Sequence, residues 1–136
     1  MTSTSHCTPN NPLDFCNLPG QGFDPEGYHG WTAYQQSRLA AILFSNQLNR
    51  EFAAASSGAT SVAVAELDAW FIGAKLLLEE DKEEMATGPA STLAVLGSEQ
   101  ALGGHYVVDS QSVPPGEHAL AAGDAEALWA YSIARV

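Results

Sequence analysis

The sequence predicts an α+β fold: an extended N-terminal arm, then an antiparallel helical hairpin, then a small antiparallel β-sheet of short strands. Three observations predict it. Residues 1–30 are rich in proline and glycine, residues 31–87 contain two helical apolar patterns around one short loop, and residues 88–136 alternate short apolar segments with turn signals. A chain of 136 residues fits one domain, so we expect residues 31–136 to form a single domain behind the arm.

The arm, residues 1–30, holds four prolines and four glycines, a density that prevents a regular helix. Apolar side chains nevertheless recur along it: Leu13, Phe15, Leu18, Phe23 and Tyr28. This spacing predicts a segment that lies on another surface, either that of its own domain or that of a neighbour.

Residues 31–56 are predicted to form the first helix, because no proline or glycine interrupts them. Thr32 and Gln35 have the spacing of a capping box, which favours a start at Thr32. The stretch Leu39–Phe44 is apolar on every side, which predicts a helix surrounded by other elements or other subunits. The positions that follow the helical period are Tyr34, Ala41, Phe44 or Ser45, Leu48 and Phe52.

A second helix is predicted over residues 61–86, after a loop at residues 56–60. Its apolar stripe advances by three and four residues, as in helices that pack side by side. The stripe consists of Val64, Leu67, Phe71, Ala74, Leu78 and Met85, and Trp70 widens it. Two long helices joined by a short loop predict an antiparallel hairpin.

The C-terminal region contains four short apolar segments, at residues 93–96, 106–109, 118–121 and 128–133, separated by glycine and proline turns. We predict short strands for all four. The last one is ambiguous. Trp129, Tyr131 and Ile133 alternate and would share one strand face, whereas Asp124 before Ala125 is also a good helix start. The sequence favours the strand.

Charge excludes several classes of partner. Five Lys and Arg against 16 Asp and Glu give a net charge of −11, so the chain lacks the basic stripe of a nucleic-acid binder or of a protein attached to an anionic membrane. No apolar run is long enough for a membrane span. The N-terminus lacks the pattern of a signal peptide, and we expect synthesis in the cytoplasm.

No metal or catalytic motif stands out. His6, Cys7, Cys16 and His29 are zinc-ligand types, but no paired spacing pre-forms half a site, and we expect no metal and no cofactor. The two cysteines are expected to be free thiols in a reducing compartment, and the alternative in an oxidising medium is a short-loop disulfide between Cys7 and Cys16. The carboxylates near His29 are explained by a turn before the first helix, so we do not expect an enzyme.

One acidic run lies at the end of the second predicted helix. It consists of Glu79, Glu80, Asp81, Glu83 and Glu84 around a single lysine. Acidic groups at a helix C-terminus oppose the helix dipole, and like charges one turn apart repel. The plainer interpretation is a solvated last turn, and the alternative is an acidic patch that meets a basic partner or divalent cations.

These features predict a non-enzymatic structural subunit of a large homo-oligomeric assembly, similar in type to the capsid-decorating or tail-associated proteins of virus particles. The chain would associate with itself and with another structural protein, and it would become part of a virion. Its arm would dock on neighbours, so that deletion of residues 1–25 leaves the fold intact and abolishes assembly. The predicted interface residues are Leu13, Phe15, Leu18, Phe23, Tyr28, Trp31, Phe44, Trp70 and Phe71.

The alternative hypothesis is a small oligomeric ligand-binding or inhibitory protein. Its pocket would lie between the sheet and the helices. The residues predicted to line it are His105, Tyr106, His118, Trp129 and Tyr131. An enzyme that uses His29 or His105 with a nearby acid is a third and weaker hypothesis.

Overall fold

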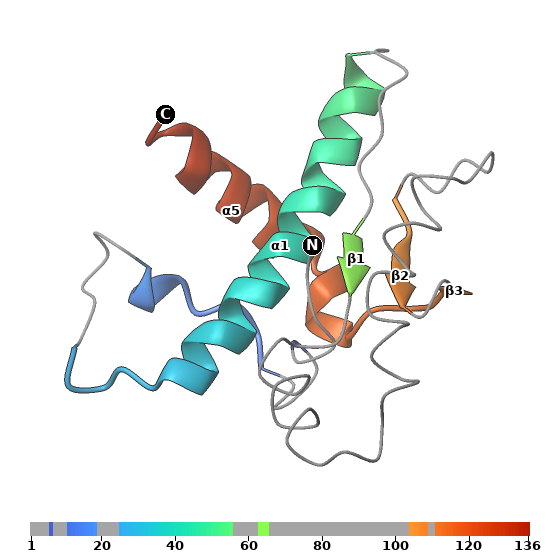
Figure 1. Cartoon of the computed structure of the whole chain (residues 1–136). Helices are drawn as coiled ribbons and strands as arrows, with labels where there is room; N and C mark the ends of the chain where they lie inside the picture. Colours follow the sequence, from blue (N-terminus) through green and yellow to red (C-terminus); the bar gives the residue numbers. More distant parts are fainter. Residues whose placement is uncertain (1–5, 7–10, 19–24, 56–62, 66–103, 109–110) are drawn as a thin grey trace, which may run out of the picture.

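The fold is of the mixed α+β class, as predicted (Figure 1). The computed structural model describes residues 6, 11–18, 25–55, 63–65, 104–108 and 111–136. Its elements, in chain order, are the 3-10 helix η2 (Phe15–Asn17), helix α1 (Gly30–Ala54), strands β1 (Ala63–Ala65), β2 (Tyr106–Val108) and β3 (Gln111–Ser112), the 3-10 helix η3 (Glu117–Leu120) and helix α5 (Ala122–Ile133). None of the described helices is both long enough and apolar enough to cross a membrane.

Helix α1 confirms the first predicted helix but begins earlier than the capping box suggests. His29 is its N-cap residue, in an extended conformation, and no side chain caps the first turn. Thr32 instead lies inside the helix, with its Oγ1 atom 3.5 Å from His29 Nδ1. The predicted capping box is therefore wrong, since Gln35 is buried and does not reach back to the helix start.

The buried face of α1 also differs from the predicted stripe. Ser45 is the one position of that stripe that is buried, whereas Phe44 is exposed. The buried residues of α1 are Gln35, Leu39, Ile42, Leu43, Ser45 and Gln47. An apolar run without a polar side has no unique core face in the sequence, so the packing partners decide which residues are buried.

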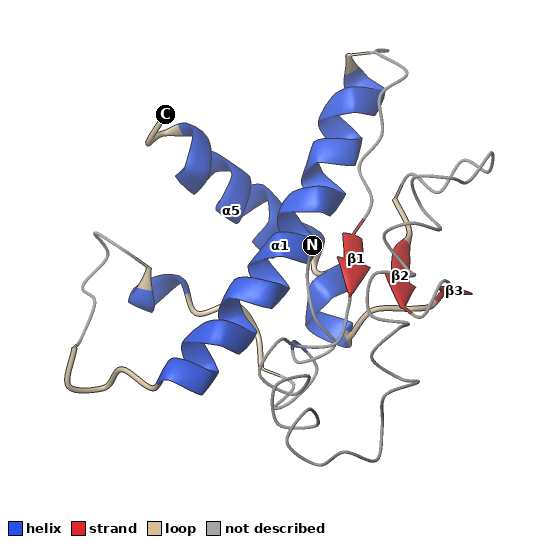
Figure 2. Cartoon of the chain, viewed as in Figure 1, coloured by secondary structure: helices blue, strands red, loops and turns tan. Residues whose placement is uncertain are grey.

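Residues 122–133 form helix α5, so the strand predicted over residues 128–133 is wrong (Figure 2). Ala125 and Leu128 are the buried positions, and a spacing of three residues follows the helical rather than the strand period. Alanine is the strongest helix former, and Asp124 lies in the first turn, where the helix dipole favours a negative charge. The segment predicted as a strand over residues 118–121 is also helical and belongs to η3.

The three described strands form a mixed sheet in the order β1–β2–β3. Val107 pairs with Val64 in a parallel ladder and with Ser112 in an antiparallel ladder. The prediction of a strand at residues 106–109 is confirmed over β2, and the antiparallel pairing predicted within residues 88–136 is found between β2 and β3. Strand β1 adds a parallel ladder from outside that region, which was not predicted. The start of the second predicted helix is wrong, since residues 63–65 form β1.

Two parts of the predicted fold lie outside the described residues. One is the remainder of the second helix, residues 66–86, and with it the hairpin. The other is the predicted strand at residues 93–96.

The core lies where α1 meets α5 and η3. Helix α5 crosses α1, and the strands lie to the right of both in Figure 1. Leu39, Ile42 and Leu43 of α1 are almost completely buried, and each such side chain stabilises the fold by about 1.5–3 kcal/mol. The full cluster is Leu13, Leu39, Ile42, Leu43, Tyr106, Ala119, Ala125 and Leu128.

Two hydrogen bonds fix the position of α1 against these partners. Asn46 Nδ2 donates to the carbonyl of Ala119 at 2.9 Å, and Arg50 Nη1 donates to the carbonyl of Ala122 at 3.5 Å. Side chains of α1 thus donate to the Ala119 carbonyl of η3 and to the Ala122 carbonyl at the start of α5. The crossing is therefore held by side-chain hydrogen bonds as well as by apolar contact.

Candidate interaction surface

Gln36 of α1 holds the described part of the arm by two hydrogen bonds to the arm backbone. The backbone N–H of Asp14 donates to Gln36 Oε1 at 2.7 Å, and Gln36 Nε2 donates to the carbonyl of Pro12 at 3.1 Å. The residue between them, Leu13, is 6% exposed and belongs to the core cluster. We call Gln36 and the core site that takes Leu13 the arm seat, because together they hold residues 12–14.

The arm then turns into η2. The Asp14 carboxylate accepts from the backbone N–H of Cys16 at 3.0 Å, which is a helix-capping contact. Phe15 packs partly against the core, and Cys16 is an exposed free thiol. Residues 12–17 thus have a defined path along the first turns of α1.

A second contact ties the chain before the arm seat to the C-terminal region. The backbone N–H of Gly116 donates to His6 Nε2 at 3.0 Å, across 110 positions of sequence. The His6 ring is buried and meets the Tyr106 ring edge-on, with 5.2 Å between centroids. Since Nε2 accepts here, the proton of the neutral ring is on Nδ1. The contacts of His6 thus include a backbone amide and an aromatic ring of the C-terminal region.

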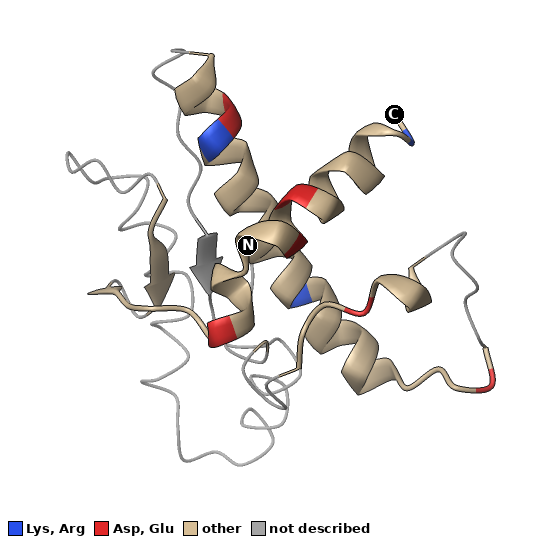
Figure 3. Cartoon of the chain, turned by 180° about the vertical axis from the view of Figure 1, so that it is seen from behind, with Lys and Arg blue, Asp and Glu red and all other residues tan. Residues whose placement is uncertain are grey.

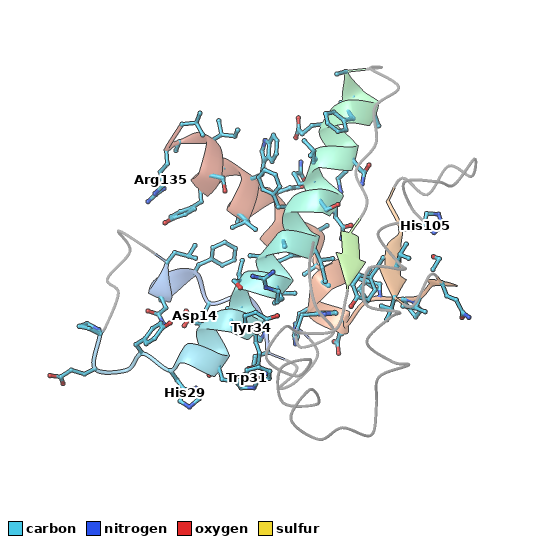
Figure 4. All side chains as sticks on the ribbon, in the orientation of Figure 1. Asp14, His29, Trp31, Tyr34, His105 and Arg135 are labelled. Carbon is cyan, nitrogen blue, oxygen red and sulfur yellow. The ribbon has the colours of Figure 1, made fainter. Side chains whose placement is uncertain are left out.

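An ordered ladder of side chains runs along the first turns of α1 (Figure 4). The rings of Trp31 and Tyr34 stack with centroids 5.7 Å apart and planes 20° apart, and the Arg38 guanidinium lies 4.8 Å from the Tyr34 centroid. Positions separated by three and four residues share one helix face. Trp31 is nevertheless 39% exposed. We call these three residues the aromatic ladder.

The aromatic side chains of the described residues lie mostly outside the core. Nine of the chain's Phe, Trp and Tyr residues are described, and Tyr106 alone among them is buried. Phe44 is exposed on α1 even though its ring lies 5.1 Å from that of Trp129, and Tyr28 is 55% exposed. Aromatic residues usually dominate cores and interfaces. Here the described core is aliphatic apart from Tyr106, while Tyr28, Trp31 and Phe44 are exposed at the surface.

The predicted interface residues divide into three groups. Leu13 is in the core, while Phe15 and Leu18 are half-buried. Tyr28, Trp31 and Phe44 are exposed. Phe23, Trp70 and Phe71 lie outside the described residues, as do the acidic residues Glu79, Glu80, Asp81, Glu83 and Glu84.

The residues predicted to line a pocket are distributed over the molecule. His105 Nδ1 and Ser112 Oγ are hydrogen-bonded at 2.7 Å, and this pair is exposed. The Tyr131 ring lies against the guanidinium of Arg135, with 3.5 Å between Cζ and the ring centroid. Figure 4 shows His105 and Arg135 on opposite sides of the molecule, so the structure does not bring His105 and Tyr131 together.

The other three pocket residues have separate environments. Tyr106 is buried in the core, His118 is half-buried in η3, and Trp129 packs on Phe44.

Charged groups are sparse over the described surface. Figure 3 shows the described acidic and basic residues at scattered positions along the ribbon. Arg50 is engaged within α1, where it donates to Gln47 Oε1 at 2.6 Å. Among the described residues, no three His, Cys, Asp or Glu side chains are close enough together to hold a metal ion.

Three features of the surface and core were not predicted. The spacing of Trp31, Tyr34 and Arg38 is a signal by which the aromatic ladder could have been found. The role of Gln36 has no such signal, because it depends on where the arm returns to the helix. The third is Gln35, which is 4% exposed, and neither polar atom of its amide has a hydrogen-bond partner among the described residues.

The chain matches no family model, and no curated protein or solved structure is significantly similar to it.

Proposed function

We propose that this protein is a non-enzymatic structural subunit that assembles with copies of itself, in the manner of the capsid-decorating and tail-associated proteins of virus particles. The observation that carries the proposal is the exposure of three large aromatic side chains, Tyr28, Trp31 and Phe44, beside a core that is aliphatic apart from Tyr106. Large aromatic side chains at the surface lose contact with water when another protein covers them, and this burial drives association.

The aromatic ladder supplies the residue types that dominate binding energy at interfaces. Trp, Tyr and Arg are enriched among interface residues whose truncation costs most. Trp31, Tyr34 and Arg38 are also held in one arrangement by ring stacking and a cation–π contact. Side chains that are ordered before binding lose less conformational entropy when the partner arrives.

The partner that fits this surface is a second copy of the chain. Acidic residues outnumber basic ones by 16 to 5, so two copies repel each other at long range, and the burial of aromatic surface has to outweigh this repulsion. Only 15% of the residues are charged, so few charged groups have to be desolvated when two copies meet. Self-association of this kind gives the repeated subunits of a large assembly.

The test compares the native mass of two serine variants with that of the unmodified chain. Trp31→Ser removes the outer ring of the aromatic ladder, and Ile133→Ser is the matched control, because Ile133 is also exposed but lies at the end of α5. Sedimentation velocity over a range of protein concentrations measures the dissociation constant of each. We expect Trp31→Ser to weaken association by about thirtyfold, which corresponds to about 2 kcal/mol.

The control should associate as the unmodified chain does. Equal dissociation constants for all three proteins would exclude the aromatic ladder as the contact, and a clean monomer in every case would exclude self-assembly altogether. Circular dichroism checks that both variants keep their helix content.

A further inference from the structure

His6 joins the start of the chain to the C-terminal region through a contact that requires an unprotonated ring nitrogen. Its Nε2 atom accepts from the backbone N–H of Gly116 at 3.0 Å, and its ring meets that of Tyr106 edge-on. We call these three residues the histidine clasp. A backbone N–H only donates, so a proton added to Nε2 removes the hydrogen bond and sets two N–H groups against each other.

The burial of the ring acts in the same direction. His6 is 4% exposed, and a charged group inside a protein is costly unless it is both paired and hydrogen-bonded. A ring that has left the histidine clasp is hydrated by water and takes up the proton there without losing a bond to the protein. Lower pH therefore favours the open clasp, because the open form binds the proton more readily than the closed form.

The elements that contact the ring carry other titratable groups. Tyr106 faces the ring from β2, and the exposed His105 precedes it in the chain. In the segment that leads into η3, Gly116 is followed by the exposed Glu117 and the half-buried His118. A test of the histidine clasp therefore has to leave these four neighbouring side chains unchanged.

We propose that the histidine clasp is a pH-sensitive contact, which is closed at neutral pH and opens in mildly acidic solution. Histidine is the side chain that ordinarily changes its charge between about pH 5 and pH 8. The proposal goes beyond the proposed self-assembly and does not depend on it, because the contact lies within one chain.

The arm seat provides a comparison within the same molecule. Its two hydrogen bonds join the Gln36 amide to the backbone N–H of Asp14 and to the carbonyl of Pro12. Amide and backbone groups do not titrate between about pH 5 and pH 8. The Asp14 N–H should therefore keep its acceptor over the range in which the Gly116 N–H loses its own.

Hydrogen exchange followed by NMR compares these two amides in the full-length chain at about pH 7.5 and about pH 5.5, with each rate divided by the intrinsic rate at that pH. We expect the protection of Gly116 to fall by about tenfold at the lower pH, since opening is favoured tenfold for each pH unit below the ordinary titration range of histidine. The protection of Asp14 should stay constant.

The His6→Gln variant tests whether His6 is responsible. Its side-chain oxygen can accept from Gly116 but does not titrate, and the other three histidines remain. We expect the protection of Gly116 in this variant to be the same at both pH values. The same tenfold fall in the variant would assign the pH dependence to another group and overturn the proposal.

A second readout uses the unmodified chain alone and does not depend on the folding of the variant. The carbon-bound protons of the His6 ring report its protonation through their chemical shifts, and the loss of Gly116 protection should follow them. If the ring takes up its proton while Gly116 stays protected, the histidine clasp is not sensitive to pH. A ring that remains neutral down to about pH 5 with Gly116 protected would overturn the proposal as well.

Discussion

The middle of helix α1 and its first turns differ in what their side chains meet. Leu39, Ile42 and Leu43 in the middle lie in the core, whereas the first turns carry the exposed Trp31, which stacks on the half-buried Tyr34. The same helix thus uses aliphatic residues for packing and aromatic residues for an ordered exposed face. The contrast teaches that the stability of this fold and its proposed recognition of partners depend on different residues, so mutations should separate the two.

The largest effect on stability is expected from a substitution in the packed middle of α1. Leu43 is fully buried, and Leu43→Ala removes its side chain from the core and leaves a cavity. We expect a loss of about 2–5 kcal/mol in the free energy of unfolding, measured by urea denaturation. Trp31→Ser, from the exposed face, should change the same quantity by less than about 1 kcal/mol. A comparable loss in both variants would contradict the division of α1 into two roles.

The next largest effect on the free energy of unfolding is expected in the arm, because Leu13 is packed in the core. Leu13→Ala should lower the free energy of unfolding by about 2–3 kcal/mol, since Leu13 is in the core cluster. Leu18→Ala is the control and should cost less than about 1 kcal/mol, because Leu18 is only half-buried. If the two alanine variants are equally stable, the arm does not contribute to the core.

This result also bears on deletion of residues 1–25. The sequence predicts an intact fold after that deletion, but the deletion removes Leu13 from the core. The shortened chain should therefore lose stability as well as assembly.

How far the sequence predicted the structure depends on the type of signal. Helix α1 was predictable because 25 residues pass without a proline or an internal glycine after Gly30. Helix α5 was misassigned because Trp129, Tyr131 and Ile133 alternate, and two or three alternating positions do not outweigh an alanine-rich segment. The partners of α1 depend on residues distant in sequence, such as Ala119 and Leu128, which no local pattern specifies.

The burial of the predicted interface residues also depends on contacts between residues distant in sequence. Trp31 and Phe44 are exposed, and their aromatic character is visible in the sequence. Leu13 looks no different from Leu18 in the sequence, but it is buried because Gln36 holds the backbone on either side of it. This arrangement depends on tertiary contacts across more than twenty positions, which periodicity does not report.

A smaller effect is expected at Gln36, where the arm meets the helix. Gln36→Ala removes two hydrogen bonds to the arm backbone, and we expect a loss of about 1–2 kcal/mol in the free energy of unfolding. Hydrogen exchange should show faster exchange at the amide of Asp14, whereas the amides of α5 should keep their protection. Unchanged exchange at Asp14 would mean that Gln36 does not hold the arm.

The smallest effect is expected at Gln35 and has the opposite sign. Gln35→Met keeps the approximate volume of the side chain and removes a buried amide that lacks hydrogen-bond partners among the described residues. We expect the free energy of unfolding to rise by about 1 kcal/mol, measured by urea denaturation. A decrease of that size would show that the Gln35 amide makes a stabilising contact in solution.

Sedimentation velocity of the unmodified chain at several protein concentrations and ionic strengths tests the central claim most directly. If exposed aromatic surface drives self-association, the mean mass rises with concentration. It also rises as salt shortens the Debye length from about 30 Å to about 8 Å, because two copies of charge −11 then repel less. A single species of 14.3 kDa under all these conditions would contradict the claim that this protein assembles with itself.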